Sequence, residues 1–307
     1  MTAAAPVRPA ATLAGHPADR LLDAFDRVGA PVCVGLDPVA ERLPAELRSL
    51  SAAEAIERFS LGVIEAIRSH VACVKLQSAC YERLGVDGVG VLHRVALAAK
   101  EAGLEVILDA KRGDIGISAE HYAAASALHQ ADWTTVSPYL GADGITPFLR
   151  ANGNASMGAF ALVRTSNPSG DALQSLRLVD GRTIAEAVAD LVATIGGSTG
   201  ATSAGQIGSR GFSSLGAVVG ATKRQDAAAL RVRMPQQIFL VPGYGAQGGG
   251  VDDVLPCFRP DGRGAIVTAS RSVIYPQASD TAGDWRTPIE RAAAAFRGEI
   301  RAGLGLS

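Results

Sequence analysis

The chain has 307 residues, a formal net charge of −1 and a hydrophobic content of 48%. A charge balance so close to zero gives no electrostatic footprint for nucleic acid or an anionic membrane, so an anionic ligand must be held by a local site. The length accommodates two ordinary domains, but α/β barrels of about 250 residues or more fold as one domain.

The first fifteen residues, MTAAAPVRPAATLAG, are rich in alanine and proline, and Pro and Arg interrupt any apolar core of a signal peptide. We therefore expect residues 1–15 to form a flexible tail. No apolar run reaches the roughly 18 residues that a transmembrane helix needs. Four scattered cysteines without a C-x-x-C motif predict buried free thiols and a reducing, cytoplasmic location.

Short apolar runs recur along the chain. They predict eight strands: Val32–Leu36, Cys73–Leu76, Glu105–Leu108, Thr134–Val136, Ala159–Val163, Gly216–Val219, Ile238–Val241 and Ala265–Thr268. Their nearly continuous apolar character is typical of parallel strands that are covered on both faces.

Stretches with a helical period separate most of these strands. Ser51 with Glu54 predicts a capping box before a helix whose apolar residues recur at a period of about 3.6. Further helices are predicted around residues 92–99, at 183–195 and at 226–232. Alternating strands and helices predict a (β/α)8 TIM barrel with a parallel eight-stranded core, a single domain over residues 16–304.

The segment GGSTGATSAGQIGSRGFSSLG, residues 196–216, interrupts the alternation of strands and helices before the sixth strand. Its Gly, Ser and Thr content predicts a long mobile loop. We expect either an inert insertion or a lid over a ligand.

Ionisable residues gather at the ends of the first three strands, where a barrel of this kind places its chemistry. Five would converge on one mouth: Asp37, Lys75, Asp109, Lys111 and Asp114. Asp109 and Lys111 are two residues apart on a strand and share a face, whereas Asp114 must curl back from a loop or reach another subunit. Taken singly, each has an ordinary explanation as a turn former or an ion pair. Because burying several charges is unfavourable, the alternating array indicates a preorganised electrostatic site.

The turns after the last two strands indicate a phosphate site. GYGAQGGG offers backbone N–H groups, and SRS offers Arg271 as a bidentate donor. Residues 243–248 also match G-x-G-x-x-G, but no long helix follows, which disfavours a dinucleotide site. After the fifth strand, RTSNPSG presents Thr165, Ser166 and Asn167 either to a polar ring or to a capped turn.

These segments, in this order, resemble the orotidine 5′-phosphate decarboxylases over about residues 19–275. The motif DAKRGDIG carries the resemblance, in the form typical of the longer bacterial branch, the type 2 subfamily. VGLDP, VKLQSACYE, PYLGAD, RTSNP, PGYGAQGG and SRSVIYP support it. The resemblance implies a carboxy-lyase of pyrimidine biosynthesis that converts orotidine 5′-phosphate to UMP and CO2 without a metal or cofactor.

The resemblance also implies roles for matching residues. Lys111 would protonate C6 of the pyrimidine, and Asp109 would lie beside the substrate carboxylate. Lys75 and Asp114 would complete the charged array, with Asp114 contributed by the partner subunit of a homodimer. Substrate contacts are implied for Asp37, Ile115, Ser118, Ser166, Pro242, Gln247, Gly248 and Arg271. No nucleic-acid or membrane partner is expected.

Two positions depart from the family pattern: Ser137 stands where Asn is expected, and Ser118 where Thr is common. Three alternatives stay open. A metal-dependent sugar-phosphate decarboxylase or aldolase of the same superfamily shares the D-x-K-x-x-D motif, but needs an acidic ligand where Lys75 would repel Mg²⁺. A Schiff-base aldolase needs a lysine of lowered pKa at Lys111, whereas flanking carboxylates raise it. A catalytically silent binder of nucleotides or sugar phosphates would need only the phosphate site.

Overall fold

The protein is a closed barrel of eight parallel strands, seen in a computed structural model that describes residues 15–149, 157–197, 207–245, 248–276 and 284–306. The strands follow one another around the barrel in chain order, and β8 pairs with β1. They are β1 (Val32–Leu36), β2 (Cys73–Gln77), β3 (Glu105–Arg112), β4 (Trp133–Val136), β5 (Gly158–Arg164), β6 (Leu215–Val219), β7 (Phe239–Val241) and β8 (Ala265–Ala269). The predicted fold class and all eight predicted strands are confirmed. The predicted domain limits stay a prediction.

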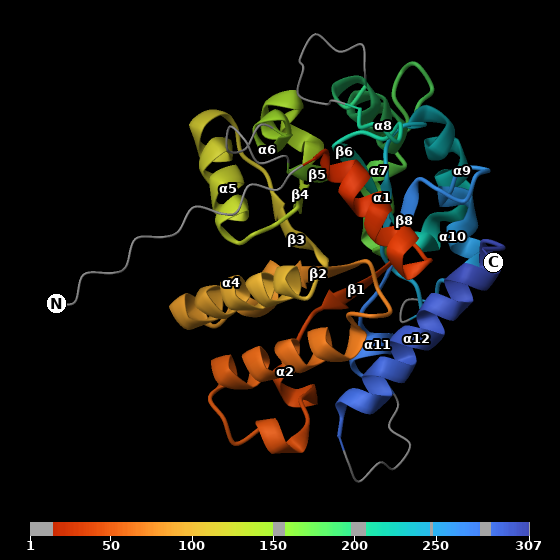
Figure 1. Cartoon of the computed structure of the whole chain (residues 1–307). Coiled ribbons are helices and arrows are strands. Elements are labelled where there is room, and N and C mark those ends of the chain that lie inside the picture. The colour runs from red at the N-terminus through yellow and green to blue at the C-terminus, as the bar shows by residue number, and fades with distance from the viewer. Residues whose placement is uncertain (1–14, 150–156, 198–206, 246–247, 277–283, 307) are drawn as a thin grey trace.

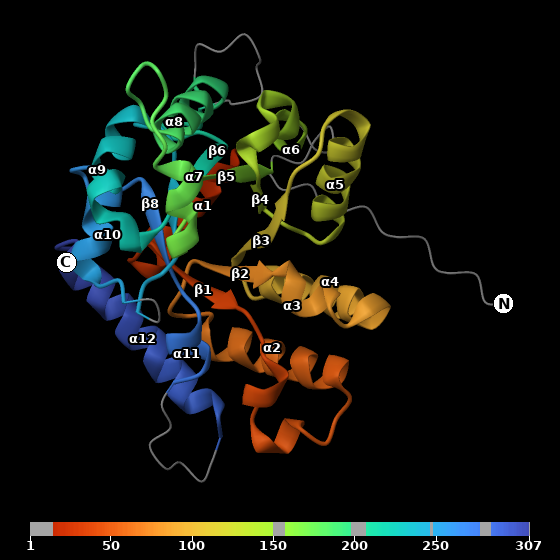
Figure 2. The ribbon, with the colours of Figure 1, turned by 180° about the vertical axis from the view of Figure 1, so that it is seen from behind.

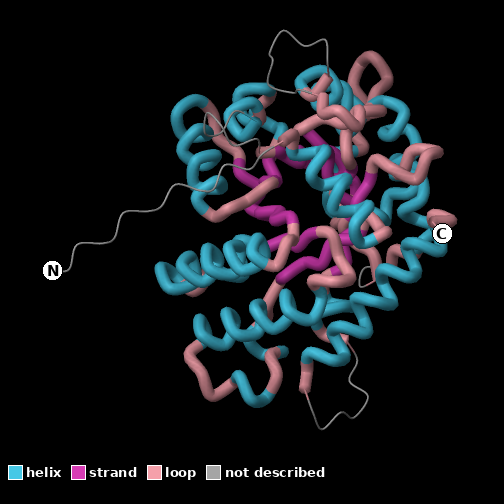
Figure 3. Tube along the Cα trace, viewed as in Figure 1, coloured by secondary structure: helices cyan, strands magenta, loops and turns pink. Residues whose placement is uncertain are grey.

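Helices surround this barrel, so that the strands form an inner ring (Figure 3). The longer ones are α1 (Pro17–Val28), α2 (Ala52–Ile67), α4 (Gly85–Glu101), α5 (Gly116–Leu128), α8 (Ile184–Ile195), α9 (Arg224–Arg233) and α12 (Arg286–Gly303). The shorter ones are α3 (Ser78–Glu82), α6 (Thr146–Leu149), α7 (Asp171–Gln174), α10 (Val251–Val254) and α11 (Arg271–Ile274). The predicted capping box of Ser51 and Glu54 is present at the start of α2. No helix of the described segments has the length and apolar character to cross a membrane.

Side chains fill the interior of the barrel toward the amino ends of the strands. Trp133 and Phe160 stack inside it with their ring centroids 4.6 Å apart. Gly158 makes room for this packing, because a Cβ there would lie 2.3 Å from the Trp133 ring. Leu21 and Leu22 of α1 pack against the same cluster, so that α1 closes the amino end of the barrel. Figure 1 faces this closed end, and Figure 2 faces the opposite end, where α3, α7 and α11 follow their strands.

The segment before β6 is anchored at the closed end of the barrel. Asp19 of α1 accepts hydrogen bonds from the backbone N–H groups of Ser209 and Arg210, at 2.8 and 3.0 Å. Arg210 also pairs with Asp23, at 2.8 Å. The described part of the Gly/Ser-rich segment, residues 207–216, therefore packs away from the strand ends and does not form a lid. Residues 198–206 lie outside the described segments.

Candidate active site

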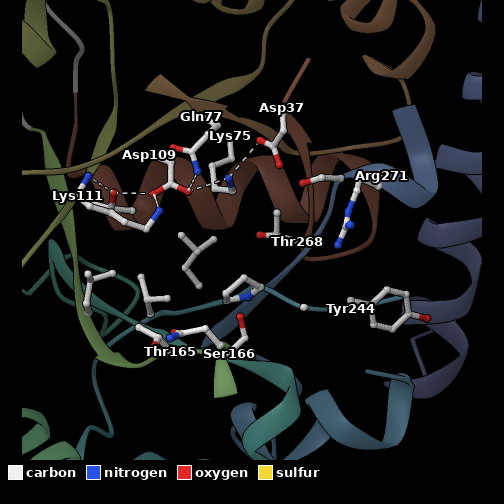
Figure 4. A pocket seen from close by; sticks show the side chains of 18 residues that line it. Asp37, Lys75, Gln77, Asp109, Lys111, Thr165, Ser166, Tyr244, Thr268 and Arg271 are labelled. Carbon is white, nitrogen blue, oxygen red and sulfur yellow. Dashed lines mark hydrogen bonds and ion pairs between the residues drawn. The ribbon is translucent and has the colours of Figure 1, made fainter. Parts of the chain in front are cut away.

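The carboxyl ends of the strands open into a pocket of about 510 Å³. Its charged lining residues are Asp37, Lys75, Asp109, Lys111 and Arg271. Its apolar lining comes from Leu162, Val218, Leu240 and Pro242. Figure 4 shows the acids and lysines along one wall, with Lys111 at one end of the pocket and Arg271 at the other. The pocket thus has a charged wall, an apolar wall and a separate cationic end.

Four of the predicted site residues form a continuous alternating chain. Lys75 Nζ lies 2.9 Å from Asp109 Oδ2 and 3.6 Å from Asp37 Oδ1. Lys111 Nζ lies 2.6 Å from Asp109 Oδ1. Lys75 and Asp109 are buried, while the side chain of Lys111 is 47% exposed. Of these four residues, Lys111 therefore supplies the accessible ammonium, which lies at the mouth and is paired with the buried carboxylate of Asp109.

The electrostatics of the pocket favour the charged forms of Lys75 and Asp109. Burial alone would raise the pKa of Asp109, but the charges of Lys75 and Lys111 outweigh it and hold that pKa well below its usual range. Burial alone would lower the pKa of Lys75, but Asp37 and Asp109 outweigh it and raise that pKa above its usual value. Lys75 and Asp109 are therefore both charged at neutral pH.

An irregularity in the sheet shapes the carboxyl end of β3. The register between β3 and β4 shifts between Leu108 and Arg112, and Lys111 has a φ of 46°, in the left-handed region. Left-handed backbone is unfavourable for a residue with a Cβ, so neighbouring contacts must hold it. Thr135 supplies one such contact, because its Oγ1 accepts the N–H of Lys111 at 2.9 Å.

The structure adds pocket residues that were not predicted from the sequence, among them the polar residues Gln77, Thr135 and Thr268. Gln77 donates to Asp109 Oδ2 at 3.4 Å, and Thr135 donates to Asp109 Oδ1 at 2.8 Å. Thr268 is 4% exposed and its hydroxyl has no hydrogen-bond partner among the described residues. All three lie on strands and point their side chains into the barrel. Strict alternation of inward and outward side chains along β2, β4 and β8 would therefore have found them.

The glycine-rich turn after β7 differs from the expectation. Gly245, Gly248 and Gly249 donate their N–H groups to Gly249, Gly245 and Gly243 carbonyl oxygens within the turn itself. The prediction that this turn offers free N–H groups is therefore wrong for these three residues, because the turn's own hydrogen bonds use them. Gln247 lies outside the described residues. Arg271, at the start of α11, remains the cation at this end of the pocket.

The segment after β5 brings Ser166 to the pocket, opposite the charged wall. Its neighbour Arg164 is 4% exposed and pairs with Asp226 at 2.6 Å. Gln174 of α7 accepts the N–H of Thr165 at 3.0 Å and donates to its hydroxyl at 2.8 Å. These contacts fix the strand end that carries Ser166.

Asp114, Ile115 and Ser118 do not line this pocket. Asp114 Oδ1 accepts the N–H of Ile115 at 2.8 Å, and the Ile115 side chain is 54% exposed. Within one chain, these three residues therefore do not contribute to the lining of the pocket.

Comparison with known proteins places this architecture. A sequence model described as the orotidine 5′-phosphate decarboxylase / HUMPS family matches residues 30–283. The chain belongs to this family. The family match and the relatives below confirm the resemblance, while the type 2 assignment stays a prediction.

The relatives of this family member cover most of its length. It is 42% identical to the orotidine 5′-phosphate decarboxylase of Rhodopirellula baltica, over 84% of this chain and 88% of the relative. It is 39% identical to that of Deinococcus radiodurans, over 90% and 93%. The solved structure of Leishmania donovani OMP decarboxylase matches with a TM-score of 0.74 at 31% identity, covering 95% of this chain and 100% of that one.

Proposed function

We propose that the protein decarboxylates orotidine 5′-phosphate to UMP and CO2, a step of pyrimidine biosynthesis. The carrying observation is the alternating chain of Asp37, Lys75, Asp109 and Lys111 in the pocket of a member of this family. A cytoplasmic location is part of the proposal, supported by the four free cysteines Cys33, Cys73, Cys80 and Cys257.

The proposed chemistry follows from where charge develops. Loss of CO2 leaves an electron pair on C6, an sp² carbon, and fixed cations stabilise such a carbanion-like transition state. Lys111 is the accessible ammonium, 2.6 Å from Asp109, and it stabilises this charge and then transfers a proton to C6. Asp109 keeps Lys111 charged and oriented, and its own charge repels the substrate carboxylate.

The rest of the nucleotide is bound away from the reacting carbon. Arg271 holds the phosphate at the end of the pocket opposite Lys111 (Figure 4). Asp37 and Lys75 hold ribose hydroxyls, while Ser166 and Pro242 contact the pyrimidine. Binding energy gained at the remote phosphate then holds C6 against the charged wall, which raises the rate of the chemical step.

The proposed site is completed by a second copy of the chain. Asp114 does not reach the pocket of its own chain, and exposed apolar side chains flank it: Ile115 is 54%, Ile117 is 68% and Tyr139 is 84% exposed. Burying these side chains in a homodimer is favourable and would carry Asp114, with Ile115 and Ser118, to the partner's Lys111 end.

Lys75 argues against the metal-dependent sugar-phosphate lyase. That enzyme needs an acidic ligand at the end of β2, and here a buried cation lies 2.9 Å from Asp109. Mg²⁺ at this place would be repelled by a fixed positive charge.

The test is to mix the purified protein with orotidine 5′-phosphate and to follow the loss of its ultraviolet absorbance in excess EDTA. The proposal expects turnover that EDTA does not affect. Turnover that requires added Mg²⁺ would support the metal-dependent lyase. Binding of UMP without turnover would instead support a silent nucleotide-binding protein.

A further inference from the structure

We propose that Thr135 is a positioning residue of the active site, whose hydroxyl fixes the backbone of Lys111 and the carboxylate of Asp109 relative to each other. This inference rests on the proposed decarboxylase function, because its effect is exerted through Lys111 and Asp109. Thr135 is not a member of the charged chain and does not need to touch the substrate.

The hydroxyl of Thr135 makes two hydrogen bonds of unambiguous direction. Its Oγ1 accepts the backbone N–H of Lys111 at 2.9 Å, because that N–H can only donate. It donates to Asp109 Oδ1 at 2.8 Å, because an ionised carboxylate can only accept. The side chain is 1% exposed, so water does not substitute for either bond. One hydroxyl thus joins the two residues on which the proposed chemistry depends.

The sheet explains why this bridge is needed. Leu108 pairs with Thr134 and Arg112 with Val136, so three residues of β3 lie opposite Thr135 alone. Such bulges redirect side chains, and they leave backbone groups without a partner in the ladder. The N–H of Lys111 is one of these groups, and its donor bond goes to a side chain of β4. The hydroxyl of Thr135 therefore replaces the backbone hydrogen-bond acceptor that the N–H of Lys111 lacks at this bulge.

The same bridge holds Lys111 in an unfavourable conformation. With a φ of 46°, Lys111 has left-handed backbone, which a residue with a Cβ keeps only where its surroundings impose it. This turn directs Nζ of Lys111 back to Asp109 Oδ1, the same oxygen that accepts from Thr135. Without the hydroxyl, the backbone relaxes and the ammonium loses its fixed place over the reacting carbon.

The expected signature is a loss of rate without a loss of nucleotide affinity. Thr135 lies at the Lys111 end of the charged wall, and the phosphate and ribose contacts of Arg271 and Asp37 do not involve it. A misplaced proton donor lowers kcat, because catalysis depends on orientation in the transition state. If Thr135 were purely structural, its removal would instead lower the stability of the fold and leave kcat per folded molecule unchanged.

The chain supplies a matched control one residue away. Thr134 lies on the same strand, is 0% exposed, and its hydroxyl has no hydrogen-bond partner in the described part of the chain. Thr134→Val and Thr135→Val remove the same atom from the same strand, on its two opposite faces. Thr135→Ser keeps the hydroxyl and serves as the conservative rescue.

The experiment measures kcat and KM for orotidine 5′-phosphate, Kd for UMP by calorimetry, and the thermal midpoint, for the parent and the three variants. Thr135→Val should lower kcat roughly tenfold to a hundredfold and change Kd for UMP by less than about threefold. Thr135→Ser should stay within about threefold of the parent kcat, and Thr134→Val should match the parent. Should Thr135→Val fail to fold, Thr135→Ala takes its place with the same expectation.

The outcomes separate this inference from the function on which it rests. A parent protein without turnover overturns the proposed function, and the role of Thr135 falls with it. An active parent with an unchanged kcat in Thr135→Val overturns the positioning role alone. The same holds if Thr135→Ser is as slow as Thr135→Val, or if Thr134→Val is equally slow.

Discussion

Lys75 and Asp109 face each other from neighbouring strands, with Nζ 2.9 Å from Oδ2 and both side chains buried. Removing two charges from water is costly, and their mutual attraction offsets this only while both are present. The pair therefore contributes both to the charge arrangement of the site and to the stability of the fold.

Replacing Lys75 with Met should destabilise the fold, because it leaves Asp109 buried with one cation instead of two. We expect a loss of about 3 kcal/mol in the free energy of unfolding at neutral pH, measured by urea denaturation. Arg94→Met is the control, since its pair with Glu57 is exposed and should contribute no more than about 1 kcal/mol. Equal losses in the two variants would contradict the view that burial makes the Lys75 pair special.

Replacing Lys111 with Ala should abolish turnover and leave nucleotide binding. Lys111 is the accessible ammonium of the charged array, so its loss removes both the proposed stabilising charge and the proposed proton donor. We expect kcat to fall at least about a thousandfold, with Kd for UMP within a few-fold of the parent. A near-normal kcat in this variant would refute the proton-donor role.

Replacing Arg271 with Ala should act on the phosphate. A charge-assisted bond to phosphate contributes about 1.5–3 kcal/mol, so KM should rise roughly tenfold to a hundredfold, and kcat should fall as well. The substrate supplies the control: with orotidine, which lacks the phosphate, parent and variant should react at the same slow rate. A penalty that persists with orotidine would place Arg271 elsewhere in the mechanism.

The proposed sharing of Asp114 predicts complementation. Lys111→Ala and Asp114→Ala should each be inactive, but exchange of subunits between them creates dimers in which one site has lost both residues and the other has lost neither. About a quarter of all sites should then recover activity, as measured after mixing under mild denaturant. Persistent inactivity of a mixture that demonstrably contains mixed dimers would place Asp114 in its own chain's site.

The fold was predictable because its signals are local. The apolar runs specify strands, and Ser51 with Glu54 specifies the start of α2. The end of β3 was missed, since the predicted strand stops at Leu108 and the observed one continues to Arg112. The charged residues of this extension interrupt the apolar pattern, and the left-handed φ of Lys111 follows from contacts with β4 that no local propensity encodes.

The members of the site were predictable to different degrees. Asp37, Lys75 and Asp109 were found because they interrupt or follow apolar runs whose carboxyl ends must meet at one mouth. Hydrogen bonds inside the glycine-rich turn were not predictable, because they depend on how the turn closes on itself. The cluster at the opposite end of the barrel was also missed, since its charges come from segments far apart in sequence.

That second cluster joins Glu105 and Asp132, at the starts of β3 and β4, to Arg20 of α1 and Lys100 of α4. Lys100 Nζ lies 2.6 Å from Asp132 and 3.7 Å from Glu105, and Arg20 lies 3.3 and 3.7 Å from the same two acids. Burial and the charge of Asp132 together raise the pKa of Glu105 to about 7, against the opposing charges of Lys100 and Arg20. The fold therefore binds a proton at Glu105 that the unfolded chain releases at lower pH.

The raised pKa of Glu105 predicts how the stability of the fold changes with pH. A carboxyl group with a raised pKa in the folded state contributes stability below its unfolded value of 4.5, and that contribution is lost as pH rises to about 7. Glu105→Gln imitates the protonated form. The free energy of unfolding of this variant minus that of the parent should therefore increase from pH 4.5 to about pH 7, by at most about 3 kcal/mol, and then level off. Urea denaturation at intervals between pH 4.5 and pH 8.5 measures the difference, with the exposed Glu101→Gln as a control expected to stay within about 0.5 kcal/mol of the parent. A difference for Glu105→Gln that decreases with rising pH would mean that Lys100 and Arg20 outweigh the burial of Glu105 and hold it ionised.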